Sequence, residues 1–227
     1  MTDDRSSESI GARRETRIGV FAEAPLPGRC LSKLLAAHTP EWASGLYAAM
    51  LRDTLDGLQS IDAREYVVFA PDDDEATSAL TRHVPAPWQI VGDVGDVGAA
   101  MARLEGGSGL ALVARSDAPS AAVERLVDLA SSPADSPFAI LGPAEGGDAW
   151  LVGIARTDPL LVRDLPWASP ELAATVRVRC TRAALALHEL PAATVVDEPS
   201  AVLTLLDELR RFPERAPRTA HYVVTRG

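Results

Sequence analysis

The chain has 227 residues, of which 47% are apolar and 24% charged, and its formal net charge is −10. This length and composition are typical of a globular protein with one large domain or two small ones. The negative charge disfavours a broad surface for nucleic acid or anionic lipid. No apolar run reaches the roughly 18 residues of a membrane-spanning helix. We therefore expect a cytoplasmic protein with small-molecule partners, no nucleic acid and no membrane.

The cysteines indicate which kinds of site to exclude, and the composition of the chain ends indicates where the domain begins and ends. Cys30 and Cys180 lie far apart in sequence, so neither a disulfide framework nor a zinc cluster is indicated. Residues 1–15 are polar and lack the apolar core of a secretory signal, so we expect a disordered N-terminal tail. We expect one domain over 16–212 and a polar C-terminal tail over 213–227.

Short apolar runs alternate with helical patterns along the chain. In 199–211, for example, apolar residues recur at i, i+3, i+4 and i+7 from Val202. The alternation predicts an α/β fold with a mainly parallel, Rossmann-like sheet and helices on both faces. In chain order we predict a strand at 17–22, a helix at 41–58, a strand at 65–70, a helix at 75–82, a strand at 89–91, a helix at 97–104, a strand at 109–114, a helix at 119–130, strands at 138–141 and 150–155, a helix at 170–187, a strand at 194–196 and a helix at 199–211.

Three loops follow predicted strands and are candidate binding sites, because ligands of open α/β sheets bind beyond the carboxyl ends of the strands. The loop APLPGRCLSKLL at 24–35 carries Arg29 and Lys33, which could contact a phosphate or be solvated charges on a turn. Asp117 and Asp197 each follow a predicted strand and precede a proline. The two carboxylates could share a divalent cation that holds a nucleotide diphosphate, or each could cap the helix that follows.

Several segments, taken in order, resemble a bacterial family of glycosyltransferase-like proteins related to the phospholactate and molybdenum-cofactor guanylyltransferases. These segments are PLPGRCLSKLL, LYAAMLRDTL, GDVGDVGAAM, ARSDAP, LGPAEGGDAWLVGI, LPWASPELAATV and VVDEPSAV. The resemblance covers roughly residues 17–211. It implies the GT-A fold of nucleotide-diphospho-sugar transferases. It also implies group transfer to a small-molecule acceptor, either glycosyl transfer from a nucleotide sugar or nucleotidyl transfer from a nucleoside triphosphate.

The resemblance also implies a nucleotide site and a metal site. The family pattern Gly-Ser-Asp-x-Pro corresponds to residues 115–119, so Asp117 is expected to bind Mg²⁺ or Mn²⁺, with Asp197 as a second ligand. In the first loop, Glu23 and Leu31 replace two lysines of the family pattern. Since Leu31 cannot donate to a phosphate, we expect nucleotide binding to depend on the cation more than in relatives with the full loop. Nucleotide contacts are implied for Ala24, Pro25, Gly28, Arg29, Ser32, Lys33, Gly95, Asp96 and Ser116.

The acceptor side departs most from the family. The pattern Gly-Pro-x-x-Asp-Gly-Gly-Tyr-Tyr-Leu-x-Gly is replaced by GPAEGGDAWLVG at 142–153. Gly146 stands at the acidic position, and Asp148 stands where the pattern has glycine, so Glu145 or Asp148 would have to supply the missing carboxylate. We therefore expect Asp117, Asp148 and Glu145 as catalytic residues. The alternative is a catalytically degenerate member that binds a nucleotide or a protein partner.

Overall fold

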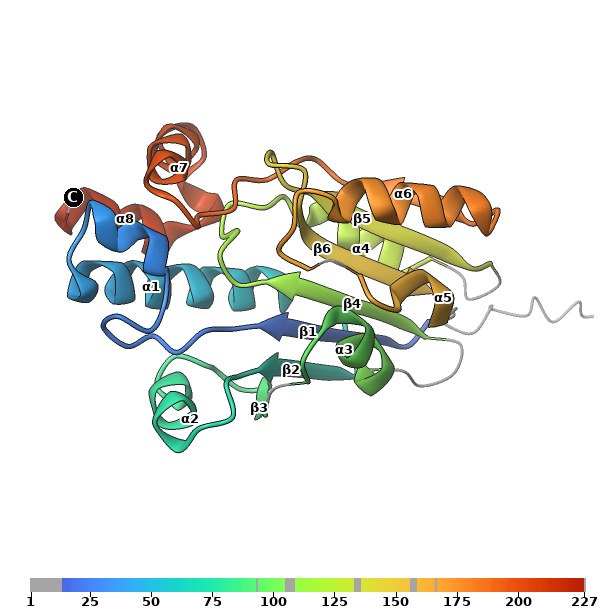
Figure 1. The fold of residues 1–227 in the computed structure, drawn as a ribbon, viewed down its shortest axis with the longest axis horizontal. Coiled ribbons are helices and arrows are strands. Elements are labelled where there is room, and N and C mark those ends of the chain that lie inside the picture. Colours follow the sequence, from blue (N-terminus) through green and yellow to red (C-terminus); the bar gives the residue numbers. More distant parts are fainter. Residues whose placement is uncertain are drawn as a thin grey trace, which may run out of the picture.

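A seven-stranded sheet with the order β3-β2-β1-β4-β6-β5-β7 forms the centre of the molecule (Figure 1). The computed structural model describes residues 14–92, 94–104, 109–132, 136–155, 159–165 and 167–226. The tail expected at 1–15 lies almost wholly outside these residues. The strands are β1 Thr16–Phe21, β2 Glu65–Phe69, β3 Gln89–Val91, β4 Leu110–Arg115, β5 Phe138–Pro143, β6 Ala149–Ala155 and β7 Ala186–Glu189.

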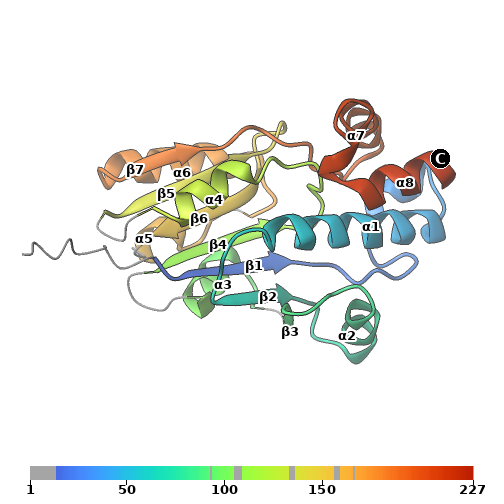
Figure 2. The same ribbon diagram turned by 180° about the vertical axis from the view of Figure 1, so that it is seen from behind.

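Helices cover both faces of the sheet, as the alternating pattern predicted. One core lies under α1, α4, α7 and α8, and the other lies under α3, α5 and α6. Figure 1 shows α3, α5 and α6 in front of the sheet, whereas Figure 2 shows α1 and α4 in front from behind. The helices are α1 Pro40–Leu58, α2 Asp74–Thr81, α3 Val97–Leu104, α4 Glu124–Ala130, α5 Pro159–Val162, α6 Leu172–Arg182, α7 Pro199–Arg211 and α8 Pro217–Arg226, with short 3-10 turns at Ser32–Ala36 and Pro213–Arg215.

Strand β6 runs against the direction of its two neighbours, so the mainly parallel sheet is mixed. It pairs antiparallel with β4, where Ala114 faces Leu151, and antiparallel with β5. Both β4 and β6 are almost wholly buried, which suits continuous apolar sequences at the centre of a covered sheet. Because of the reversed direction, the first residues of β6 lie beside the last residues of β4. This places the β5–β6 turn at the edge where β1, β2 and β4 end.

Three predicted elements in the second half of the chain need correction. Residues 170–187, expected as one helix, form α6 and then β7, separated by a turn in which Ala184 has a φ of 49°. Strand β7 was missed because it is short and half-exposed and therefore lacks a clear apolar pattern. The strand expected at 194–196 is not formed, and Ala193 makes only an isolated bridge to Ala144. Helix α4 begins at Glu124, five residues later than expected.

The segment from Pro213, expected as a polar tail, instead ends in helix α8, which packs along α1. The carboxylate of Asp53 on α1 is buried and accepts hydrogen bonds from the Thr219 amide and hydroxyl, both at 2.8 Å. Close approach is possible because Gly45 has no Cβ, which would come 2.3 Å from the Tyr222 hydroxyl. Among the described residues, no helix has the length and apolar character needed to cross a membrane.

We expect Asp53→Ala to lower the free energy of unfolding by about 3 kcal/mol, because it leaves the buried donors of Thr219 without a partner. Urea unfolding followed by circular dichroism measures this loss. Asp56→Ala is the matched control, since Asp56 is more exposed and its bond to Arg218 should contribute less than about 1 kcal/mol. Equal losses for the two variants would contradict the anchoring role of Asp53.

Candidate functional site

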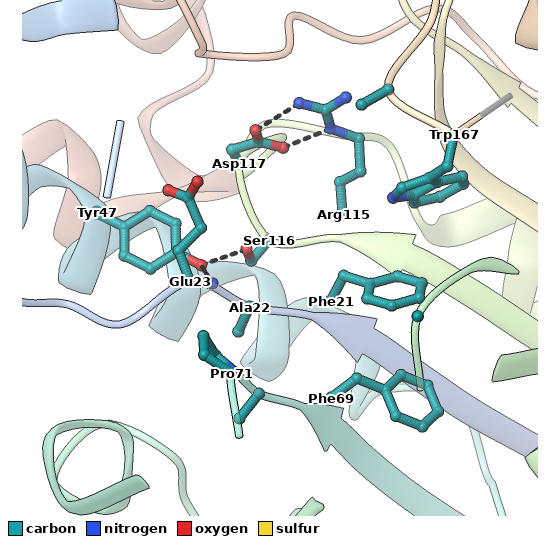
Figure 3. Close-up of a pocket in the computed structure, with 13 residues that line it drawn as sticks. Phe21, Ala22, Glu23, Tyr47, Phe69, Pro71, Arg115, Ser116, Asp117 and Trp167 are labelled. Atoms are coloured by element: carbon teal, nitrogen blue, oxygen red, sulfur yellow. Dashed lines mark hydrogen bonds and ion pairs between the residues drawn. The ribbon is translucent and has the colours of Figure 1, made fainter. Parts of the chain in front are cut away.

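Two adjoining cavities lie at the edge where β1, β2 and β4 end. The first, called the aromatic cavity, has a volume of about 330 Å³ and is shown in Figure 3. The second, called the acidic cavity, has a volume of about 340 Å³ and lies between the β5–β6 turn and the start of α7. Ala168 lines both. The aromatic cavity is lined by Phe21, Phe69 and Trp167 on one side and by Glu23, Tyr47, Arg115, Ser116 and Asp117 on the other, and the acidic cavity by Lys33, Glu145, Asp148, Asp197, Glu198 and Ser200.

The wall formed by Phe21, Phe69 and Trp167 gives the first cavity an apolar side. The ring of Phe21 lies between the other two, with centroids 5.3 Å from Phe69 and 5.6 Å from Trp167. Phe21 and Phe69 are the last residues of the paired strands β1 and β2, so the sheet register sets their positions. Figure 3 shows the three rings along one side and the polar groups on the other. The cavity can therefore accept a ligand with a planar apolar part and a polar end.

The guanidinium of Arg115, the last residue of β4, joins two carboxylates at the boundary of the cavities. Nε donates to Oδ1 of Asp117 at 2.8 Å and Nη2 donates to Oδ2 at 2.7 Å, a bidentate pair that Figure 3 displays. Nη1 donates to Oδ2 of Asp148. The three side chains are only 12%, 14% and 15% exposed. Burial at this level makes charge-assisted hydrogen bonds stronger than they are in water.

The environment shifts the pKa values of Arg115 and Asp148. Burial lowers the pKa of Arg115, but the hydrogen bonds and charges of Asp117 and Asp148 more than offset it, so the pKa ends above its ordinary value. Arg115 is therefore a permanent cation. Burial raises the pKa of Asp148 above the ordinary carboxyl value, although the Ala149 amide and Arg115 act in the opposite direction. A buried carboxylate with a raised pKa is typical of groups that exchange protons in catalysis.

Asp148 reaches Arg115 because of the tight turn between β5 and β6. The left-handed conformation of this turn falls on Gly147, with a φ of 87°, where a Cβ would lie 2.6 Å from the carbonyl oxygen of Pro170. Asp148 itself is not among the described residues with positive φ. Its position is therefore open to side chains, although the family pattern has glycine there.

A second network connects the loop after β1 to the end of β4. The Glu23 amide donates to the Tyr47 hydroxyl at 2.6 Å, and that hydroxyl lies 2.6 Å from the hydroxyl of Ser116. The carboxylate of Glu23 accepts the Leu31 amide at 2.8 Å. Burial raises the pKa of Glu23, and the nearby charge of Asp117 raises it further. Ser116, expected at the nucleotide, thus lines the aromatic cavity while its hydroxyl also positions Tyr47.

The two basic side chains of the first loop, Arg29 and Lys33, pair with different carboxylates. Arg29 forms an exposed ion pair with Asp73, at 2.5 Å, and another with Glu75, at the start of α2. Lys33 lies at the acidic cavity, where its amine contacts Asp197 at 2.8 Å. The other loop residues expected to contact a nucleotide, Ala24, Pro25, Gly28 and Ser32, line neither of the two cavities.

Of the remaining residues expected at the site, some line one of the two cavities and others do not. Gly95, with a φ of 83°, lines the aromatic cavity. Asp96 lies outside both cavities and caps α3 by accepting the Ala99 amide at 2.8 Å. Glu145 is exposed on the β5–β6 turn and lines the acidic cavity. The structure therefore brings Asp117 and Asp148 together, with Glu145 in the adjoining cavity.

The expected Mg²⁺ or Mn²⁺ site at Asp117 and Asp197 does not fit this arrangement. Asp117 pairs with Arg115, whereas Asp197 pairs with Lys33. Within the described part of the chain, no three His, Cys, Asp or Glu side chains are grouped so that they could hold a metal ion. Sequence reasoning overlooked Arg115, although the signal was present because the family pattern has glycine at that position.

Comparison with known proteins supports the fold. No protein-family model matches the chain, and no curated protein matches it. A crystal structure of a presumed nucleotide-diphospho-sugar transferase from Desulfovibrio desulfuricans G20 is similar, with a TM-score of 0.80 at 22% identity, covering 93% of this chain and 95% of that one. The protein Rv0371c of Mycobacterium tuberculosis H37Rv, solved in complex with manganese, gives a TM-score of 0.52 at 16% identity, covering 86% of this chain and 100% of that one. The fold is of the GT-A type.

We expect Glu23→Gln to stabilise the protein increasingly as the pH rises. The folded-state pKa of Glu23 lies above its ordinary value of 4.5, so folding favours the neutral carboxyl. Any stability from the neutral form is present at low pH and is lost in the wild type as the pH rises through the folded-state pKa. Glutamine stays neutral and keeps an acceptor for Leu31. The difference in free energy of unfolding between variant and wild type should therefore grow as the pH rises above the ordinary carboxyl pKa of 4.5.

Glu145→Gln is the control for removing one negative charge at this edge of the sheet, because Glu145 is exposed on the β5–β6 turn. Urea unfolding of the three proteins at each pH gives the comparison. A difference between Glu23→Gln and wild type that does not change with pH would show that the carboxyl is not destabilised by burial.

Proposed function

We propose that this protein is a nucleotide-dependent group transferase, with a nucleotide sugar or nucleoside triphosphate as donor and a small molecule as acceptor. The observation that carries the proposal is the pair of adjoining cavities that meet at Arg115, Asp117 and Asp148 in a GT-A fold. Each volume lies at the lower end of the roughly 300–1,000 Å³ usual for ligand pockets. Two such cavities can hold donor and acceptor on either side of the reacting bond.

The aromatic cavity suits the nucleoside part of the donor. Base rings stack favourably on aromatic side chains, and Trp167 and Phe21 offer such a surface. Arg115 lies on the polar side of the same cavity, where its guanidinium can contact the phosphate groups. We therefore place the base against the aromatic wall and the phosphates toward Arg115 and the acidic cavity.

The acidic cavity suits a hydroxyl-bearing acceptor, because carboxylates accept hydrogen bonds from hydroxyl groups. In the proposed transfer, an acceptor oxygen forms a bond to the transferred group as the bond from that group to the phosphate oxygen breaks. Asp148 takes the acceptor proton, with Glu145 as the other candidate base, and Arg115 stabilises the charge on the departing phosphate. Asp117 holds Arg115 in orientation. No step requires a divalent cation.

We expect nucleotide binding to quench the fluorescence of Trp167 and to weaken in Trp167→Phe. A smaller ring stacks less well, so the dissociation constant should rise on the order of tenfold. Titration of the donor panel by fluorescence and calorimetry measures both effects. Trp42→Phe is the matched control, because Trp42 stacks on His38 outside both cavities. If Trp42→Phe and not Trp167→Phe changed binding, the base would have to bind elsewhere.

We expect Asp148→Asn to lower the turnover of donor and acceptor by roughly 100-fold or more, because loss of a general base typically has this effect. Product formation should be followed over a panel of nucleotide sugars, nucleoside triphosphates and hydroxyl acceptors. Asp207→Asn is the control, since Asp207 forms only an exposed ion pair on α7. Equal turnover by wild type and both variants would rule out this role for Asp148.

The second candidate function is a binding module without turnover. It is favoured by the ion pair between Asp148 and Arg115, which competes with proton transfer from an acceptor. The two candidates differ in the assays above. Nucleotide binding that depends on Trp167, together with no product from any donor and acceptor, would replace the transferase proposal with the binding module.

A further inference from the structure

In the cluster of Arg115, Asp117 and Asp148, all four carboxylate oxygens are already used as hydrogen-bond acceptors. Three of these bonds come from Arg115, and the fourth comes from the Ala149 amide to Oδ1 of Asp148. The oxygens that a hard divalent cation would need are therefore already engaged by a positive group.

We propose that the guanidinium of Arg115 takes the place of a divalent cation in this site, so that the protein binds the phosphate groups of its ligand without metal. A guanidinium cannot be removed by chelators or lose its proton under physiological conditions. Binding is then independent of the metal concentration. This reverses the expectation from the sequence that nucleotide binding would depend on Mg²⁺ or Mn²⁺ more than in relatives with the full loop.

Electrostatics explains why the Arg115 guanidinium and a divalent metal ion exclude each other at these carboxylates. The carboxylates of Asp117 and Asp148 are largely buried and share one guanidinium, so without a cation they would repel each other at considerable cost. Arg115 offsets this repulsion permanently. A divalent ion at the same oxygens would have to displace Arg115 or lie beside its positive charge, and both are unfavourable.

Arg115 also keeps donors for a ligand. A guanidinium has five N–H groups, and three of them donate to the two carboxylates. Within the described part of the chain, the other two N–H groups make no hydrogen bond. Arg115 lines the aromatic cavity and its Nη1 reaches the carboxylate that lines the acidic cavity. Two remaining donors at this boundary match phosphate oxygens, since guanidinium groups commonly bind phosphate in pairs of hydrogen bonds.

The first test uses Mn²⁺ alone and does not depend on the proposed function. Electron paramagnetic resonance measures free Mn²⁺ in titrations of wild type, Asp117→Asn, Arg115→Gln and Arg115→Lys. We expect wild type, Asp117→Asn and Arg115→Lys to bind equally weakly. Arg115→Gln should bind at least about tenfold more tightly, because its carboxylates have lost their cation. The double variant Arg115→Gln with Asp117→Asn should lose this gain.

Two outcomes of the Mn²⁺ titration would overturn the proposal. One is Mn²⁺ binding by wild type that Asp117→Asn abolishes, which decides the matter even if Arg115→Gln fails to fold. The other is a folded Arg115→Gln variant, judged by circular dichroism, that binds no more Mn²⁺ than wild type. Arg210→Gln is the matched control, because it removes an arginine from an exposed ion pair with Asp207 on α7.

The second test measures the phosphate contact, which rests on the proposed function. Calorimetry with pyrophosphate in the presence of EDTA should show binding to wild type and to Arg210→Gln. Binding to Arg115→Gln should be at least about tenfold weaker, since paired hydrogen bonds to phosphate are lost. If wild type binds neither pyrophosphate nor any nucleotide, the proposed function and this contact both fail. The Mn²⁺ titration would then still decide whether Arg115 excludes the metal.

Discussion

The ion pairs of Arg115 with Asp117 and Asp148 are the interaction on which the rest of the cleft depends. They connect the end of β4 to the start of β6, two strands that meet at this edge because β6 runs antiparallel. They also separate a cavity with an aromatic wall from one with an acidic lining. Since the three side chains are largely buried, removal of Arg115 would leave two carboxylates without their partner.

Charge in the cleft is distributed differently from the family pattern. Where the pattern that the sequence resembles has two lysines, the first loop has Glu23 and Leu31, and Arg29 pairs with Asp73 at the start of α2. The permanent positive charge lies instead at the end of β4, on Arg115. Glu23 carries no positive charge. Its amide donates to the Tyr47 hydroxyl, and its carboxylate accepts the Leu31 amide of the loop. Through Glu23, the loop therefore supports the wall of the aromatic cavity.

The sequence was sufficient for the α/β fold and for the edge of the sheet that holds the cavities, because apolar periodicity and chain order determine both. The sequence was insufficient where the structure of a segment depends on contacts with residues far away in the chain. Strand β7 has a weak apolar pattern and is held by pairing with β5, whereas helix α8 is held against α1 by the buried contacts of Asp53. The role of Arg115 required knowing that β6 is antiparallel, since Asp148 lies 33 residues away in sequence.

Helix α8 has a consequence for how the protein should be handled in the laboratory. The Trp42 indole donates to the carbonyl of Arg226, so the last turn of α8 is held against α1. Tyr47, which supports Glu23 and Ser116, lies on the same helix α1. A purification tag joined beyond α8 would start beside this packed contact. A tag placed before β1 would start at the opposite end of this strand from Phe21, which lines the aromatic cavity, and should leave ligand binding unchanged.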